Sequence, residues 1–581
     1  MKSSRVHALL TLAAVWLGVV LVHYPWRCLP YYWDEAGYYA PAAADFYRRG
    51  LLIPESTEKL GHTPLLTAFV GTTWRILGLS PCWAREAMML VAAATLVATY
   101  VLGCRVAGRR VGAWSASLLA VSPLFFAQSS MLHIETGPAL FVTLAVLALL
   151  PHPELPPGDS SPSRDLTSFA LAASLAILSK ETAIILLPVA WTYAWRVRRE
   201  RRPAAWFALA FPLLPILAWT LYYHHATGYW TGNVEYLQYN LYSTFNPVRF
   251  LLTLLRRLYQ LLIGGFDWIL VAGALLGAAW QRKIKGAREA GAAMAGGGRA
   301  HGQGEEQLPA PQGAAQSMNK LPAPEGPSET ARLLDISRKP ETHPHKMLGW
   351  PQAWIDSVEA HPKIFADFLL LASGLCAVYI VFHSLVGGAV LRRYLLPVFP
   401  VFYLGAVAFV WRLPKKLAQG ICVLALAYFI AAWFINPPYP FAFEDNLAYA
   451  DFVRLHQRAA HFLEGYPGAP RVLTAWPATG ELSVPFLGYL DKPLRVVPID
   501  GFAAADFRQV RADSFDLLYL YSRRWEPASN WLVRFRFLRV LQQRYFDYTL
   551  QLSDEVLTAR YGLKLVAQYE RRGQWVRIYS K

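Results

Sequence analysis

An adjacent pair of carboxylates stands among aromatic residues near the start of the chain. The segment reads Tyr31-Tyr32-Trp33-Asp34-Glu35 and follows the first apolar run directly. A carboxylate placed there can take a proton from a hydroxyl group or hold a metal ion. One acid of the pair can also cap the amphipathic segment 40–49 that follows. A cap needs only one acid and does not explain the aromatic setting, so a chemical role is favoured for Asp34, and both interpretations stay open for Glu35.

Other polar residues stand at the ends of later apolar runs. They are His62, His133, Glu135, Lys180, Glu181, His224, His225, His383, Arg392, Arg393 and Tyr394. A single His or Lys at such a position often only extends its polar head to water. Ionisable groups beside lipid are costly, however, and by default they indicate function. Acids, bases and cations on one face of a membrane are typical of chemistry on a phosphate-bearing substrate, because Arg, Lys and His bind phosphate anions.

The composition places these residues in a membrane protein. The chain has 581 residues, of which 55% are apolar and only 16% charged, whereas soluble proteins have about 25% charged residues. The net charge of +17 comes from Lys and Arg clusters between apolar runs, which indicates cytoplasmic loops rather than nucleic-acid binding. The five Cys residues form no CxxC or metal-binding spacing, so we expect them to be small apolar side chains.

Eleven apolar runs are predicted membrane crossings, although several of them are shorter than the roughly 20 residues that a helix needs to cross a bilayer. They lie near 7–23, 85–103, 111–128, 136–150, 166–179, 182–196, 204–223, 264–280, 364–385, 394–412 and 417–435. The first run is followed by no signal-peptide cleavage site, and we expect it to remain as the first span. With a cytoplasmic N-terminus, every basic cluster then falls on the cytoplasmic side. A full crossing by the apolar run 63–79 would invert this order, so that run is predicted to lie in the interface, to re-enter, or to pair with a further crossing.

This map divides the chain into four parts. Residues 1–280 form an N-terminal transmembrane region with an outer loop at 24–84, and residues 364–435 form the remaining transmembrane helices. Residues 281–363 are rich in Gly, Ala, Pro and charge, so a disordered cytoplasmic loop is predicted. Residues 436–581 alternate short β-rich runs with helical patterns and are predicted to form a soluble α/β domain. The odd number of crossings puts that domain outside, in the periplasm if the membrane is a bacterial inner membrane.

The order of the motifs resembles the GT-C fold glycosyltransferases. Asp34-Glu35 follows the first span, His62-x-Pro64-Leu65 comes next, and Lys180-Glu181-Thr182-Ala183 stands further on. The resemblance is to the protein O-mannosyltransferase-like family (glycosyltransferase family 39) and to the aminoarabinose transferases that act on lipid A, and it covers the chain to about residue 435. These enzymes move a sugar from a polyprenyl-phosphate donor to an acceptor at the outer face of the membrane.

The resemblance implies roles for several of these polar residues. Asp34 and Glu35 are the expected catalytic carboxylates, and direct displacement would invert the anomeric centre of the sugar. The donor phosphate is expected to contact His62, Lys180, Arg392, Arg393 and Tyr394. Glu135 stands where the family usually has Asp and, with Asp34, is the candidate pair for a divalent metal ion. His133, Glu181, His224, His225 and His383 complete the expected site because of their positions at the outer ends of the predicted spans, and not because of the resemblance. Gly37 stands where many relatives carry Arg and Thr63 replaces a usual Pro, which bears on the substrate more than on the reaction class.

Two other functions stay open on the sequence alone. One is a transporter or flippase of lipid-linked sugars, and the other is a non-catalytic cell-envelope assembly protein that uses residues 436–581 as a binding module. Transporters often contain internal repeats and broken spans, and no repeat is evident in this sequence. The expected partners of an enzyme are a polyprenyl-phosphate sugar donor, a protein, lipid or glycan acceptor, and membrane lipids, without nucleic acid.

Overall fold

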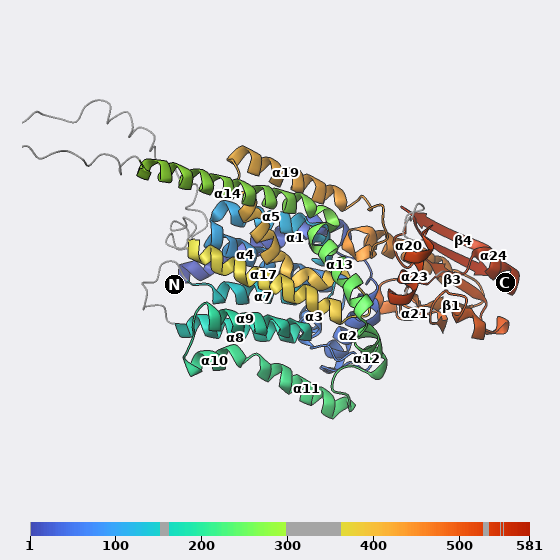
Figure 1. The fold of residues 1–581 in the computed structure, drawn as a ribbon. Coiled ribbons are helices and arrows are strands. Elements are labelled where there is room, and N and C mark those ends of the chain that lie inside the picture. Colours follow the sequence, from blue (N-terminus) through green and yellow to red (C-terminus); the bar gives the residue numbers. More distant parts are fainter. Residues whose placement is uncertain (1, 152–161, 298–361, 527–533, 547, 550) are drawn as a thin grey trace, which may run out of the picture.

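Long apolar helices form a bundle, and a small sheet domain stands at one end of it (Figure 1). The computed structural model describes residues 2–151, 162–297, 362–526, 534–546, 548–549 and 551–581. The bundle contains α1 (Lys2–His23), α4 (Pro81–Ala107), α5 (Arg109–Val121), α6 (Pro123–Gln128), α7 (Thr136–Leu149), α8 (Pro162–Ser179), α9 (Leu186–Arg196), α10 (Pro203–Ala210), α11 (Leu213–Thr227), α14 (Trp268–Gly297), α17 (Pro362–Leu385), α18 (Phe399–Val410) and α19 (Lys415–Ala432).

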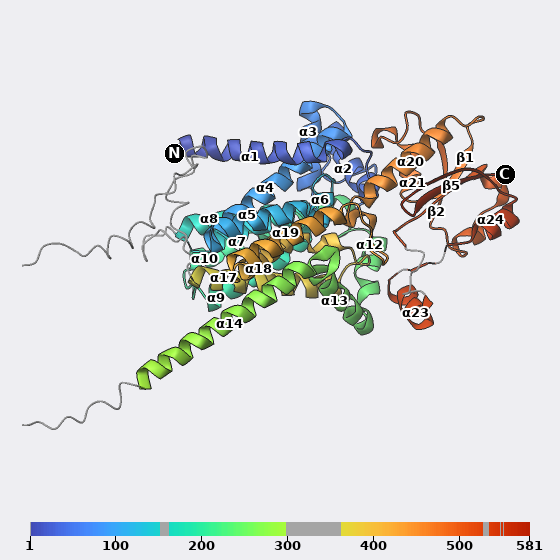
Figure 2. The same ribbon diagram turned by 90° about the horizontal axis from the view of Figure 1, so that it is seen from above.

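Other elements connect the helices of the bundle to one another or to the sheet domain. They are η1 (Tyr24–Trp26), η2 (Glu35–Tyr39), α2 (Ala40–Arg49), α3 (Leu65–Leu77), η3 (Glu181–Ile185), α12 (Val234–Asn240), η4 (Tyr242–Thr244), α13 (Pro247–Leu262), η5 (Gly264–Phe266), η7 (Arg392–Val398) and η8 (Phe443–Asp445). The beginning of the chain and the far end of α14 lie at the opposite end of the bundle from the sheet domain (Figures 1 and 2).

The apolar helices make the chain an integral membrane protein. Among the described residues, six helices are long and apolar enough to cross a membrane, or seven if the bent pair Pro247–Phe266 and Trp268–Ala287 is one span. The predicted count of eleven is therefore not confirmed, because α7 and the apolar part of α8 are shorter than such a span. Helix α3 has 13 residues and is about 20 Å long, which is less than the roughly 30 Å of hydrocarbon in a bilayer.

The predicted loop 281–363 begins later than the sequence suggested. Helix α14 continues through Gly297, because residues 281–297 contain many good helix formers such as Ala, Arg and Lys. The following segment, 298–361, lies outside the described residues, so the rest of this prediction stays untested. Helix α17 then begins at Pro362, one residue before the predicted end of the loop.

Helix α13 is amphipathic with its faces reversed relative to a soluble protein. Its apolar residues Val248, Leu251, Leu255 and Leu258 are exposed, at spacings of three and four. The opposite face is buried and consists mainly of polar residues: Arg249, Thr253, Arg257 and Gln260. In water the apolar stripe would face the core. Lipid reverses the preference, so the polar face of α13 turns inward, toward the elements that hold the candidate site.

The C-terminal domain is a mixed five-stranded sheet with the order β2-β1-β3-β5-β4. Its elements are α20 (Ala448–Glu464), β1 (Arg471–Ala475), α21 (Ala478–Ser483), η9 (Pro485–Leu487), β2 (Arg495–Ile499), η10 (Asp506–Gln509), η11 (Ala512–Ser514), β3 (Leu517–Tyr521), α23 (Arg536–Tyr545), α24 (Asp554–Tyr561), β4 (Lys564–Arg571) and β5 (Gln574–Ser580). Strand β1 is parallel to β2 and β3, whereas β3, β5 and β4 pair antiparallel. The predicted α/β domain is thus present.

One apolar core joins this domain to the outer loop. Tyr31, Tyr32 and Ala36 of the outer loop belong to the same buried cluster as Phe452 of α20 and Val472 of β1. Most buried residues of the membrane helices form a second cluster, whereas Ala84 and Met88 of α4 belong to the first one. The segment that carries Asp34 is therefore packed by the C-terminal domain on one side and by the bundle on the other.

Candidate active site

Asp34 lies at the junction between the outer loop, the bundle and the C-terminal domain. It directly precedes η2, and its neighbour Trp33 has a φ of 45°, which is rarely adopted by a bulky residue and persists only when the surroundings impose it. The Trp33 ring packs edge-on against Trp476, 5.4 Å away, and against Phe452 at 5.7 Å. Aromatic side chains of the C-terminal domain thus hold the backbone that presents Asp34.

Gly37 is explained by the same contact. A Cβ atom at this position would lie 2.5 Å from Nε1 of Trp476, well inside van der Waals contact. The indole of Trp476 covers the turn where many relatives of the family named above carry Arg. In this chain, no side chain at position 37 can reach the site, because the C-terminal domain fills that space.

Glu35 has different partners from Asp34, and both of its carboxylate oxygens accept hydrogen bonds. One oxygen accepts hydrogen bonds from the Tyr32 amide at 2.8 Å and from Arg85 at 3.2 Å, and the other accepts from the Leu132 amide at 2.7 Å. Arg85 is fully buried and also donates to the carbonyls of Leu29, Pro30 and Ser130. These bonds engage both oxygens of Glu35 and connect the segment that carries Asp34 to Arg85 and to the loop before Glu135.

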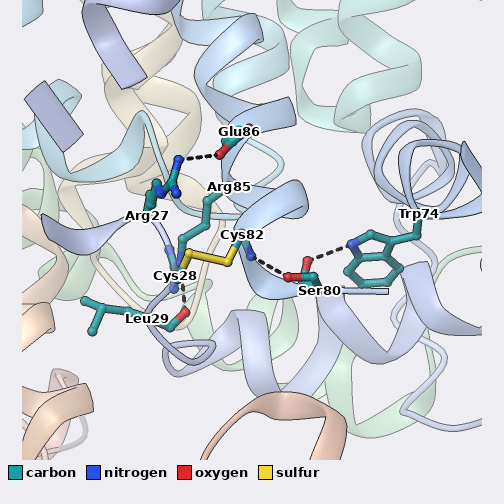
Figure 3. The surroundings of a disulfide bond; sticks show 8 residues. All are labelled: Arg27, Cys28, Leu29, Trp74, Ser80, Cys82, Arg85 and Glu86. Carbon is teal, nitrogen blue, oxygen red and sulfur yellow. Dashed lines mark hydrogen bonds and ion pairs between the residues drawn. A yellow bond between two sulfur atoms is a disulfide. The ribbon is translucent and has the colours of Figure 1, made fainter. Parts of the chain in front are cut away.

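A disulfide bond fastens the same loop. Cys28, just after η1, is bonded to Cys82 in the first turn of α4, and their Cα atoms are 4.3 Å apart (Figure 3). Arg85 lies one turn further along α4 and holds the carbonyl of Leu29. The expectation that all five Cys residues are small apolar side chains is wrong for this pair, because two residues 54 positions apart become neighbours only in the fold. Cys104, Cys376 and Cys422 are free thiols.

Loss of this disulfide is expected to destabilise the protein. The Cys28→Ser/Cys82→Ser variant should lose about 2–4 kcal/mol of unfolding free energy, because the bond restricts a long loop in the unfolded chain. Thermal unfolding in detergent measures the change, and the free-thiol variant Cys376→Ser is the control for loss of sulfur alone. A double variant that unfolds at the same temperature as the wild type, with or without reductant, would contradict this expectation.

Arg393 is the centre of the polar cluster. Its guanidinium is buried and pairs with Asp34, with Glu444 at 2.6 Å and with Glu135 at 3.3 Å. Asp34 comes from the outer loop, Glu135 from the N-terminus of α7, and Glu444 from η8 at the entry to the C-terminal domain. The side chain of Asp34 keeps 17% of its surface exposed, whereas those of the other two acids are buried. Arg393 thus holds three carboxylates together and leaves Asp34 as the accessible one.

Lys180 extends the cluster toward Tyr394. Its ammonium group donates to Glu135 over 2.7 Å and lies 4.4 Å from the centroid of the Tyr394 ring. Burial works against ionisation of Glu135, but Lys180 and Arg393 outweigh it and lower the pKa of this carboxyl group well below its usual value. Next to Lys180 in the sequence, the carboxylate of Glu181 lies 3.0 Å from Nδ1 of His62, within hydrogen-bond distance. The structure thus connects His62, Glu135 and Arg393 through Lys180 and Glu181.

Arg257 of α13 also approaches the ring of Tyr394. It is fully buried and its Cζ lies 5.5 Å from the centroid of the Tyr394 ring. Its donors bind the side chain of Gln260 and the backbone carbonyls of His383 and Leu391. Among the described residues, no carboxylate pairs with Arg257, and its Nη2 atom has no hydrogen-bond partner. A buried cation without a counter-charge is costly, so this face of Tyr394 is suited to an anion.

The other residues predicted for the site lie at different distances from the cluster around Arg393 and Tyr394. Arg392 turns away from its neighbour Arg393 and pairs with buried Asp267 at 2.5 Å, so it fixes the bend between α13 and α14. His383 stacks on Tyr394 with ring centroids 5.6 Å apart. His133 bonds Gln128 over 2.7 Å beside Arg393. His224 instead stacks on Trp230, and His225 is exposed at the end of α11, so the structure does not bring this pair to the cluster.

Glu444 is the acid whose ionisation is least favoured. Its burial raises the pKa to about 8 against the attraction of Arg393, with Asp34, Asp445 and Glu135 adding to the rise. A proton is thus bound more tightly by Glu444 in the folded protein than in the unfolded chain. The resulting contribution to stability is complete below the ordinary glutamate pKa and is lost as the pH rises through about 8.

We expect the pH dependence of stability to change in a Glu444→Gln variant. The wild type should lose thermal stability as the pH rises through about 8, and the variant should lose less, because its amide does not titrate. Unfolding temperatures measured across this range test the expectation. Glu55→Gln, which removes an acid from an exposed ion pair with Arg49 in the outer loop, is the matched control. Parallel curves for the wild type and Glu444→Gln would show that another group carries the dependence.

The proposed metal pair does not fit a metal ion in this geometry. Asp34 and Glu135 both face the guanidinium of Arg393, and Glu135 also binds Lys180. Across the described part of the chain, no group of three or more His, Cys, Asp or Glu side chains is placed to hold a metal. These carboxylates already have cationic partners, so no step of the chemistry is derived through a metal.

Three site residues were not found from the sequence. Glu444 follows the last predicted span in Phe443-Glu444-Asp445, an acidic pair among aromatics like the one at Asp34, and that likeness is a usable signal. Arg257 belongs to a polar stripe whose spacing along α13 indicates an inward face. Arg85 is embedded in an apolar helix, where a lone cation indicates a buried partner.

The middle of this cluster falls in a region that matches a known family. Residues 61–222 match the dolichyl-phosphate-mannose-protein mannosyltransferase family. The resemblance to this family is confirmed over that range, which contains His62, Glu135 and Lys180, whereas Asp34, Arg393 and Glu444 lie outside it. No curated protein matches the chain.

Solved structures of two kinds are similar to the chain at low identity. One is ArnT from Cupriavidus metallidurans bound to undecaprenyl phosphate, with 13% identity, a TM-score of 0.49, and coverage of 98% of this chain and 97% of that one. Another is the oligosaccharyltransferase from Archaeoglobus fulgidus in complex with zinc and sulfate, with 11% identity, a TM-score of 0.40, and coverage of 84% of this chain and 62% of that one.

Proposed function

We propose that this protein is a membrane glycosyltransferase of the GT-C class that takes a sugar from a polyprenyl-phosphate donor. The observation that carries the proposal is the set of three cations around the Tyr394 ring, Lys180, Arg257 and Arg393. Lys180 and Arg257 both lie over or beside this ring, and Arg257 has no carboxylate partner among the described residues. A donor phosphate placed there would supply the missing counter-charge. The family match over residues 61–222 supports the same substrate class.

The chemistry follows from the separation of charges in the cluster. The bond between the anomeric carbon and the phosphate oxygen breaks, and its electron pair leaves with the phosphate, where Lys180 and Arg257 stabilise the added charge. The acceptor hydroxyl attacks the anomeric carbon, and its proton passes to Asp34, the accessible carboxylate of the cluster. Arg393 orients Asp34 and separates it from Glu135 and Glu444. A single displacement of this kind inverts the anomeric centre.

The disulfide supports the sidedness assigned to this reaction. Disulfides persist in oxidising compartments and are rare in the cytosol, and the Cys28–Cys82 bond lies in the segment between α1 and α4 that also carries Asp34. The site and the C-terminal domain would thus face the periplasm, if the membrane is a bacterial inner membrane. The acceptor is a protein, lipid or glycan hydroxyl that reaches Asp34 from that side.

The proposal is tested with the full-length protein in detergent or nanodiscs. A panel of radiolabelled polyprenyl-phosphate sugars is supplied with membrane extract, and both the release of polyprenyl phosphate and the transfer of label are measured. The wild type is expected to release polyprenyl phosphate and to transfer the label. The Arg257→Gln variant should bind the donor more weakly than the wild type. Binding of the donors without any transfer would instead favour a transporter or flippase, and would overturn the enzyme assignment.

A further inference from the structure

Helix α23 of the C-terminal domain is short and has little support from the protein. It has ten residues, Arg536–Tyr545, and none of them is buried. A helix of this length is marginal in water by itself. Figure 2 shows α23 apart from the sheet, on the side of α13. We therefore expect another surface to cover α23 and stabilise its helical conformation.

The exposed face of α23 combines apolar and basic side chains. Phe537 is 71% exposed and Val540 is 48% exposed, while Leu541 and Tyr545, one and two turns beyond Phe537, are half-buried. Arg536, Arg539 and Arg544 accompany them, and within the described segments no ion pair joins these three to a carboxylate. An apolar edge flanked by unpaired cations is typical of a helix that lies in a membrane interface.

The neighbours of α23 place it beside helix α13, whose outward stripe faces lipid. Its C-terminal end contacts α13, where Arg256 lies 5.4 Å from the ring of Phe546. A cavity of about 210 Å³ between the two elements is lined by Ser243, Asn246, Arg249, Gly388, Arg544 and Tyr545. The outward stripe of α13, with Leu251 and Leu255 each 56% exposed, is the lipid-facing surface described above. The C-terminal end of α23 thus lies next to this lipid-facing surface.

We propose that α23 is a membrane-interface helix that binds anionic lipid headgroups and holds the C-terminal domain against the bilayer. Phe537 and Val540 would enter the boundary between headgroups and acyl chains, and the arginines would bind the lipid phosphates. Each basic residue near an anionic surface contributes a several-fold increase in binding. Trp476 belongs to this domain and Glu444 lies at its entry. An anchor at α23 would therefore hold the part of the site that these two residues form in a fixed position relative to the membrane. The proposal rests on the membrane placement of the chain and does not depend on glycosyl transfer.

The first test locates Phe537 by crosslinking. Full-length protein carrying p-benzoylphenylalanine in place of Phe537 is placed in nanodiscs of phosphatidylcholine and phosphatidylglycerol and illuminated. Lipid adducts are expected at this position. They should be absent when the same group replaces Val556, an exposed apolar residue of α24 on the same domain. Equal lipid labelling at both positions, or a crosslink to a protein at position 537, would overturn the proposal.

The second test measures the role of charge. Hydrogen exchange across residues 534–546 is compared in nanodiscs of phosphatidylcholine alone and of phosphatidylcholine with phosphatidylglycerol. Exchange should slow by about tenfold in the anionic lipid, and Arg536→Glu/Arg539→Glu should abolish that difference. Arg495→Glu/Lys564→Glu, at exposed sheet positions of the same domain, makes the same charge change and should leave the difference intact. Exchange that is independent of lipid charge in the wild type would contradict headgroup binding.

Discussion

Sugar transfer by an Asp34→Asn variant is expected to fall by about 10³-fold, in the range by which a positioned general base accelerates proton transfer. Asparagine keeps the shape of the side chain and still accepts a hydrogen bond from Arg393, but its amide takes no proton from an acceptor hydroxyl. Donor binding should be retained, because Lys180 and Arg257 lie around Tyr394 and not on Asp34. Initial rates of label transfer and a separate donor-binding measurement distinguish the two effects.

The control for this variant is Glu55→Gln. Glu55 is an exposed acid of the same outer loop, paired with Arg49, and its loss should leave the transfer rate unchanged. Near-normal transfer by Asp34→Asn, in protein that unfolds at the wild-type temperature, would refute the assignment of Asp34 as the base. A parallel loss of donor binding and transfer would move its role to holding the donor.

Replacement of Arg393 is expected to have the largest effect on stability. In Arg393→Ala, Asp34, Glu135 and Glu444 lose the cation they share, and Glu135 retains only Lys180. Removal of one partner from a buried ion pair costs about 3–5 kcal/mol, because the other charge stays buried without compensation. Thermal unfolding in detergent should show this loss.

Arg393→Lys separates charge from geometry. The ammonium keeps one positive charge, but it lacks the planar fork that reaches three carboxylates from one side chain. We expect this variant to be more stable than Arg393→Ala and still to transfer sugar poorly, because Asp34 is no longer held in place. An Arg393→Lys protein with wild-type activity would show that the charge alone is sufficient. An Arg393→Ala protein of wild-type stability would contradict the central position of this residue.

Adjacent residues in this site have opposite roles, which limits what sequence patterns can predict. Asp34 and Glu35 are neighbours, yet one binds Arg393 and the other binds Arg85. Arg392 and Arg393 differ in the same way, with Asp267 as the partner of the first. Successive side chains in a tight helical turn point in different directions. Residue type and position therefore indicated the right segments without telling which member of each pair faces the site.

Local chemistry determined the elements and the chemical character of this protein. Apolar runs specify helices that enter lipid because a bilayer offers no partner for open backbone groups, and ionisable residues at their ends indicate function because their burial is costly. The tertiary structure decided the partnerships. The Cys28–Cys82 bond, the sharing of Arg393 by Asp34, Glu135 and Glu444, and the approach of Arg257 to Tyr394 join residues far apart in the chain. Such contacts depend on how whole helices and the C-terminal domain pack, and no spacing along the sequence records that packing.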